Sequence, residues 1–198
     1  ERLVGEGSAK WLLSMRTNIP HFQAAIDYAE TLNAPELSTR CALSLIQLST
    51  WLWMNTLGLS VIPKAPLTEV SPDLKAEFLV YAAELYRQSS MITELTHAIE
   101  DARLLLSDRP TSKLTLRLEL TDAMHPSRSP EAVVSMVKRV RQDAQAGGYH
   151  LEECESYRLL AEYESSINAR FDAQVKALKV AQAHHIEMHT PKLISDLA

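Results

Sequence analysis

The chain has 198 residues, 46% of them hydrophobic, which is enough apolar material for one substantial domain with a buried core. This composition excludes a collagenous, a disordered or a disulfide-stapled chain. Only five glycines and nine prolines, together with few alternating β-branched runs, leave little material for an all-β fold, so we predict an all-α fold.

The net charge of -5 and the pI of about 5.8 provide no general attraction to nucleic acid, so we expect no direct nucleic-acid binding. One compact basic cluster exists, formed by Lys138, Arg139 and Arg141. We interpret it as the solvated side of a helix, because Val137 and Val140 belong to an apolar stripe on the opposite side. A local anion contact is the alternative.

No apolar run approaches the roughly 20 residues that a membrane span requires, so we expect no membrane association. The two cysteines, Cys41 and Cys154, lack the spacing of a metal or redox motif. They are interpreted as small buried residues of a protein from a reducing compartment, and we expect a cytoplasmic location. A disulfide between them stays open at this point.

Residues 1–57 are predicted to form N-terminal helices that pack on the later ones. A short helix is expected within residues 8–18. Pro20 lies in the first turn of the next helix, where its missing N–H costs nothing, and Asn33 closes that helix. Pro35 opens a third helix.

The third helix is predicted to run into Trp53. Trp51 and Trp53 are two positions apart, so their indoles point in different directions and cannot face the same core. They are interpreted either as plugs at the end of the core or as an exposed contact site.

Residues 58–72 contain three prolines and form the longest segment that cannot be regular helix. We predict an ordered connecting loop, and a free linker is the alternative. This loop would divide the chain into a first and a second part.

Three helical hairpins are predicted over residues 73–189. The first begins at the N-cap Ser71 and breaks at Ser89 and Ser90. The second returns through a helix capped by Ser129 and is stopped by Gly147 and Gly148.

The third hairpin is predicted to pair a helix over 151–166 with another over 170–189, separated by a break at residues 167–169. Residues 190–198 are expected to start a further helix, truncated at the end of this sequence.

The hairpins share a pattern of large and small residues, given in the first by Leu79, Ala82, Ala83, Tyr86, Leu95, Ile99 and Ala102. A second copy comprises Tyr157, Leu160, Ala161, Ala173, Ala177 and Val180. This pattern resembles the tetratricopeptide repeat, although the steps from Leu95 to Val133 and from Val133 to Ala173 exceed the family's usual 34 residues or so. Such divergent repeats resemble regulatory regions of bacterial signalling proteins.

The resemblance implies antiparallel hairpins stacked as a right-handed superhelical α-solenoid, with a concave surface that binds another polypeptide. The residues we expect to contact a partner or ligand are Trp51, Trp53, Tyr81, Tyr86 and Arg117.

A histidine group near the end of the chain is the strongest candidate for chemistry. His185 and His189 are four positions apart, the spacing of a two-histidine metal site on a helix. The zinc-protease motif places glutamate directly after its first histidine, and Ile186 occupies that position here. The group, which includes His184, is therefore interpreted as a polar helix end.

The acidic residues Glu152, Glu153 and Glu155 fall in the first turn of a predicted helix, where carboxylates complement the helix dipole. No nucleophile elbow and no glycine-rich phosphate loop occurs in the sequence. We therefore predict a non-enzyme without cofactors. The expected function is a protein-binding regulatory module of a larger signalling or transcription-regulating protein. The alternative is a small-ligand sensor with a pocket inside the solenoid, and the oligomeric state is left open.

Overall fold

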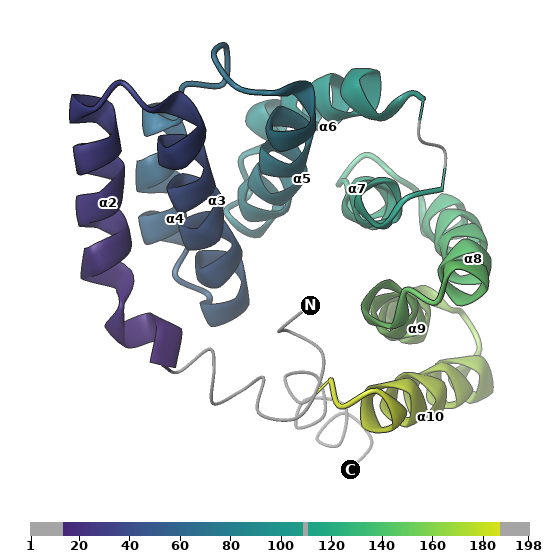
Figure 1. Ribbon diagram of the computed structural model, residues 1–198. Helices are drawn as coiled ribbons and strands as arrows, with labels where there is room; N and C mark the ends of the chain where they lie inside the picture. The colour runs from purple at the N-terminus through teal and green to yellow at the C-terminus, as the bar shows by residue number, and fades with distance from the viewer. Residues whose placement is uncertain (1–13, 109–110, 187–198) are drawn as a thin grey trace. The chain divides into compact units, whose positions relative to one another are not determined.

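The structure, a computed structural model, describes residues 14–108 and 111–186 (Figure 1). All regular elements in these ranges are helices, and each packs mainly on helices that adjoin it in the sequence. The predicted all-α fold is confirmed, while the superhelical arrangement remains a prediction. Within the same ranges, no helix combines the length and the apolar character needed to cross a membrane.

The described residues form two compact units, residues 14–108 and residues 111–186, called here the N-terminal and C-terminal units. The N-terminal unit contains α2 (Ile19–Thr31), α3 (Pro35–Leu52), α4 (Asn55–Val61), the 3-10 helix η1 (Ile62–Lys64), α5 (Pro72–Gln88) and α6 (Ile92–Leu106). The C-terminal unit contains α7 (Lys113–Ala123), α8 (Pro130–Gly147), α9 (His150–Tyr163) and α10 (Ile167–Ala183). The predicted dividing segment, residues 58–72, therefore lies inside the N-terminal unit.

Two predicted helices lie partly or wholly outside the described residues. Of the predicted helix within residues 8–18, residues 14–17 are helical, and its earlier part is not described. The further helix expected at residues 190–198 also lies outside the described ranges.

The N-terminal unit is built around α3, which contacts α2, α4 and α5. The turn from α2 to α3 places Asn33 at φ 52°, a left-handed conformation that asparagine tolerates better than most residues. The Ala34 N–H donates to the Ala29 carbonyl at 3.0 Å, so the turn is tightly closed. The fully buried large side chains of this unit are Ile26, Leu45, Ile46, Phe78, Leu85 and Leu95.

Part of the segment predicted to be non-helical is helical, because α4 and η1 extend as far as Lys64. Gly58 explains how the short α4 fits here. A Cβ at this position would lie 2.5 Å from Leu85 Cδ2 and 2.9 Å from Ser49 Cβ. The glycine therefore permits close packing on α3 and α5 and does not break the helix.

Three helix boundaries are confirmed with their caps. The Ser71 hydroxyl accepts from the Leu74 N–H at 3.4 Å, and the Ser129 hydroxyl accepts from the Ala132 N–H at 3.3 Å. In both cases proline follows the cap in the first turn, as expected. Gly148, at φ 67°, ends α8 in the left-handed conformation that glycine favours.

The predicted break of the third hairpin, at residues 167–169, is wrong by about one turn. α9 ends at Tyr163, and α10 begins where the break was predicted. Ser166 has an extended backbone and its carbonyl accepts from the Arg170 N–H at 2.9 Å, which starts the new helix. Arg170 also donates through Nε to the Ala161 carbonyl at 2.9 Å, and so joins the two helices.

The end of α10 also differs from the prediction. His185 adopts φ 52°, the Ile186 N–H donates to the Ala181 carbonyl at 2.8 Å, and the His185 N–H donates to the Gln182 carbonyl at 3.4 Å. These bonds form a Schellman motif, which terminates a helix. The prediction that His185 and His189 share a helical face is therefore wrong, because His185 lies beyond the helix. His189 is outside the described residues.

Candidate functional site

Large apolar side chains are exposed where α2 meets α3. Tyr28, Leu32 and Leu37 are 63%, 55% and 47% exposed, and we call them the α2–α3 end. Tyr28 and Leu32 are four positions apart on one helical face, and Leu37 lies in the first turn of α3. Exposed apolar groups gathered in this way are typical of protein-binding surfaces.

Trp53 is exposed at the other end of α3. It is the C-cap residue, adopts φ 56° and is 72% exposed, while Trp51 is half-buried. The different environments agree with the expectation that the two indoles face different directions. A bulky residue in the left-handed conformation costs about 1 kcal/mol, so both the backbone and the exposed indole oppose stability here.

The five residues expected to contact a partner differ in their exposure. Tyr81 and Arg117 are buried, Trp51 and Tyr86 are half-buried, and Trp53 alone is exposed. Arg117 belongs to the C-terminal unit, and the other four belong to the N-terminal unit.

Tyr86 lies on α5 in partly buried surroundings. Burial raises the pKa of its phenol, and the negative charge of Glu94 raises it further. The phenol is therefore neutral and available as a hydrogen-bonding group at neutral pH.

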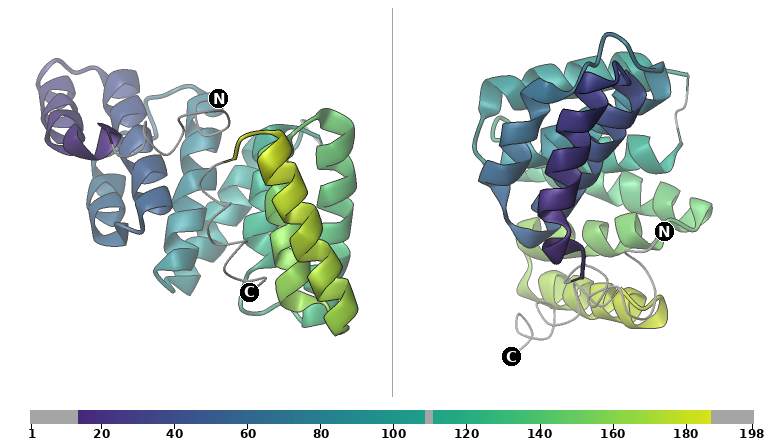
Figure 2. Two further views of the ribbon diagram at one scale, coloured as in Figure 1. Left: turned by 90° about the horizontal axis from the view of Figure 1, so that it is seen from below. Right: turned by 60° about the vertical axis from the view of Figure 1, so that its left-hand side comes forward.

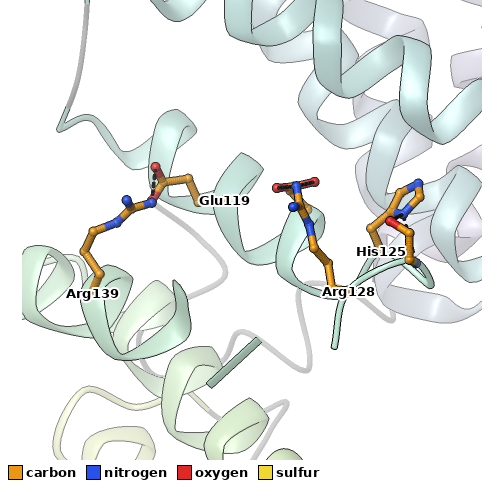
Figure 3. Close-up of polar contacts among 6 residues, drawn as sticks. Glu119, His125, Arg128 and Arg139 are labelled. Atoms are coloured by element: carbon orange, nitrogen blue, oxygen red, sulfur yellow. Dashed lines mark hydrogen bonds and ion pairs between the residues drawn. The ribbon is translucent and has the colours of Figure 1, made fainter. Parts of the chain in front are cut away.

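Ion pairs hold α7 and α8 together in the C-terminal unit (Figure 3). Arg128 Nη2 donates to both carboxylate oxygens of Asp122, at 3.0 and 2.7 Å. Arg139 Nη2 donates to Glu119 Oε1 at 2.9 Å. In the loop between the helices, His125 Nδ1 lies 2.8 Å from the hydroxyl of Ser127 on an exposed turn (Figure 3).

These contacts refine the interpretation of the basic cluster. Lys138 Nζ lies 2.6 Å from Glu164 Oε1, so Lys138 and Arg139 each reach a carboxylate of another segment. Arg141 lies over the ring of Tyr157, with its guanidinium carbon 5.5 Å from the ring centroid. The cluster is thus partly exposed but engaged in contacts within the unit.

The acidic first turn of α9 is buried. Arg117 Nη1 lies 3.5 Å from Glu152 Oε1, and both side chains are almost completely removed from water. Burial raises the pKa of Glu152, and the positive charges of Arg117 and Lys113 oppose that rise. Helix-dipole stabilisation, the sequence-based interpretation, therefore accounts for only part of what these carboxylates do.

Glu153 belongs to a second polar network. Gln145 Nε2 donates to Glu153 Oε1 at 2.7 Å and to the hydroxyl of Tyr157 at 3.3 Å, linking α8 to α9. The other oxygen, Oε2, lies 3.7 Å from His150 Nδ1.

His150 stacks on His184. The ring centroids are 3.4 Å apart and the planes are inclined by 7°. Sequence reasoning considered His184 and missed His150. The antiparallel pairing of α9 with α10 was the available signal, since it brings the start of one helix to the end of the other.

This histidine pair is a poor starting point for metal binding. Stacked imidazoles present their faces to each other, whereas a metal ligand donates an in-plane nitrogen lone pair. Among residues 14–108 and 111–186, no three His, Cys, Asp or Glu side chains are grouped so as to hold a metal ion.

Both cysteines are free thiols. Cys154 is buried with its Sγ 3.5 Å from the Ala177 carbonyl, and burial raises its pKa to about 12. Cys41 is half-buried, and burial raises its pKa as well. Both are therefore protonated at neutral pH, which makes them weak nucleophiles.

The sequence matches no protein-family model, no curated protein and no solved structure. The resemblance to tetratricopeptide repeats therefore stays a prediction from the residue pattern.

Proposed function

We propose that this chain is a non-catalytic helical module that binds another polypeptide. The observation that carries the proposal is the α2–α3 end, where three large apolar side chains within ten residues of the chain are exposed. Tyrosine and leucine at such a place contribute to association by leaving water on binding.

The contacts of the C-terminal unit support a structural role for its charged groups. Asp122, Glu119 and Glu164 each contact a basic side chain of the same unit. These ion pairs hold helices in register, which suits a rigid scaffold. We propose further, from the resemblance to tetratricopeptide-like repeats, that the module regulates a larger signalling or transcription-regulating protein.

The test is a selection of helical peptides from a display library against the whole chain, followed by affinity measurement. The Tyr28→Ser/Leu32→Ser variant should weaken binding of the selected peptides by about tenfold or more, equivalent to roughly 1.4 kcal/mol. Leu104→Ser is the matched control, because Leu104 is 76% exposed on α6 of the same unit and lies outside the α2–α3 end. Equal losses in both variants, or no enriched peptide, would contradict the proposal.

The small-ligand sensor remains the second candidate. Trp51 is half-buried and Trp53 is exposed, so a ligand that binds between α3 and the segment after it would change tryptophan emission. A saturable response to one member of a metabolite library, abolished by Trp51→Phe, would favour the sensor over the polypeptide-binding module.

A further inference from the structure

The His150–His184 stack closes the open end of the last described hairpin. His150 is the first residue of α9, and His184 is the C-cap residue of α10. The other end of the α9–α10 hairpin is closed by the turn before Ile167. Between its two ends, α10 lies alongside α9 (Figure 2). The stack is therefore placed to hold the last turn of α10 against α9.

The helices between these ends meet through small side chains. The buried positions of α10 are Ala173, Ala177 and Ala181. Alanines allow a close approach but bury little apolar area each, at about 25 cal/mol per Å². Ile186, just beyond the helix, is fully buried, so the last turn of α10 is held by Ile186 together with the stacked ring of His184.

The charge state of the two rings decides whether the stack is favourable. Two neutral imidazoles stack as aromatic rings do, whereas two imidazolium ions with centroids 3.4 Å apart repel each other. Glu153 Oε2 lies 3.7 Å from His150 Nδ1, so a carboxylate lies beside the stack. Two positive charges in the stack would face each other across 3.4 Å, which makes the doubly charged stack unfavourable.

Within the described part of the chain, two groups besides His150 act on His184. They are Glu153 of α9 and His185, which lies just beyond α10. Burial lowers the pKa of His184, the charges of His150 and His185 lower it further, and Glu153 opposes them. On α8, Gln145 holds Glu153 in place through its Oε1.

Three basic groups on the packed helices interact with other residues. Arg141 of α8 lies over Tyr157. Lys113 and Arg117 of α7 act on Glu152, the neighbour of Glu153. Among residues 111–186, Glu153 is the carboxylate that acts on both imidazoles of the stack.

We propose that the His150–His184 stack is a pH-sensitive clasp that holds the end of α10 on α9 at neutral pH and releases it in mildly acidic conditions. Because the folded-state pKa of His184 lies below its usual 6.5, its contribution to stability is present above pH 6.5 and is lost as the pH falls below that value. Release would uncover the alanine face of α10 and the surface around Cys154.

The first measurement is a histidine NMR titration of the whole chain. The ring of His184 should titrate below the usual histidine pKa of 6.5. In a His150→Gln variant the midpoint of His184 should rise towards 6.5, because the competing charge is gone. A His184 midpoint at or above 6.5 in the unaltered chain would overturn the proposal.

The second measurement is amide hydrogen exchange of the last turn of α10, corrected for the intrinsic pH dependence. Protection of Val180 and Ala181 should fall by about tenfold from roughly pH 7.5 to pH 5.5 in the unaltered chain and in the control His97→Gln. It should change by less than about twofold in His150→Gln. Should that variant fail to fold, His184→Gln replaces it, and an equal loss of protection in all variants would refute the clasp.

Discussion

Arg128 Nη2 donates to both carboxylate oxygens of Asp122, at 3.0 and 2.7 Å, across the loop that joins α7 to α8. Asp122 is buried, whereas the Arg128 side chain is partly exposed. The Arg128 guanidinium therefore places a positive charge beside the buried carboxylate of Asp122, and the pair fixes the path of the loop.

Arg128→Ala should lower the free energy of unfolding by roughly 1–3 kcal/mol, because it removes a charged donor from a buried carboxylate. Urea unfolding at neutral pH measures the loss. Arg139→Ala is the control, since the Arg139–Glu119 pair is more exposed and should contribute less than about 1 kcal/mol. The same small loss in both variants would contradict the role assigned to Arg128.

Gly58→Ala should destabilise the N-terminal unit by roughly 1–3 kcal/mol, because the new Cβ would overlap Leu85 and Ser49. Thermal unfolding followed by circular dichroism measures this change. A companion Gly58→Ala/Leu85→Val variant should lose less than the two separate changes added together, because valine lacks the Cδ2 atom nearest to the new methyl group. Additive losses would show that close packing at Gly58 is unimportant.

Features that depend on local chemistry are predictable from the sequence. Examples are the capping serines Ser71 and Ser129 and the terminating Gly148, which act through neighbouring backbone atoms. Their sequence signals were sufficient to predict these helix ends. The start of the predicted loop at residue 58 is wrong, because the role of Gly58 in α4 depends on Leu85, which is distant in the sequence and close in space.

The candidate site was harder to predict for the same reason. Exposure of Tyr28 and burial of Arg117 are properties of packing, and a periodic pattern does not separate a groove residue from a core residue. To predict the stack of His150 on His184, one must know which residues of α9 lie beside which residues of α10. The predicted break between these helices is misplaced by about one turn, so the predicted alignment of the two helices is wrong by the same amount. The helical character of these segments was therefore predictable from the sequence, whereas the contacts between helices were not.

His185→Gly should raise the thermal midpoint, because His185 occupies a left-handed position at which a side chain costs about 1 kcal/mol relative to glycine. For a domain of this size such a gain corresponds to about 2–4 °C. His97→Gly, in the interior of α6, is the opposing control and should lower the midpoint by a similar amount. A lower midpoint for His185→Gly would indicate that the imidazole makes a stabilising contact.

Arg117→Met should destabilise the C-terminal unit at pH 7 by roughly 3–5 kcal/mol, because it leaves the buried carboxylate of Glu152 without the Arg117 guanidinium. Without that charge, the folded-state pKa of Glu152 rises further above its usual 4.5. For a group whose pKa is raised on folding, the stabilising contribution is complete below the usual pKa and is lost as the pH rises through the folded-state pKa. The deficit of the variant relative to the unaltered chain should therefore shrink as the pH falls from about 7 towards 4.5, as measured by urea unfolding at each pH. The Arg117→Met/Glu152→Gln double variant should show a smaller deficit with little pH dependence, and a deficit in Arg117→Met that stays constant across this range would contradict the assigned pairing.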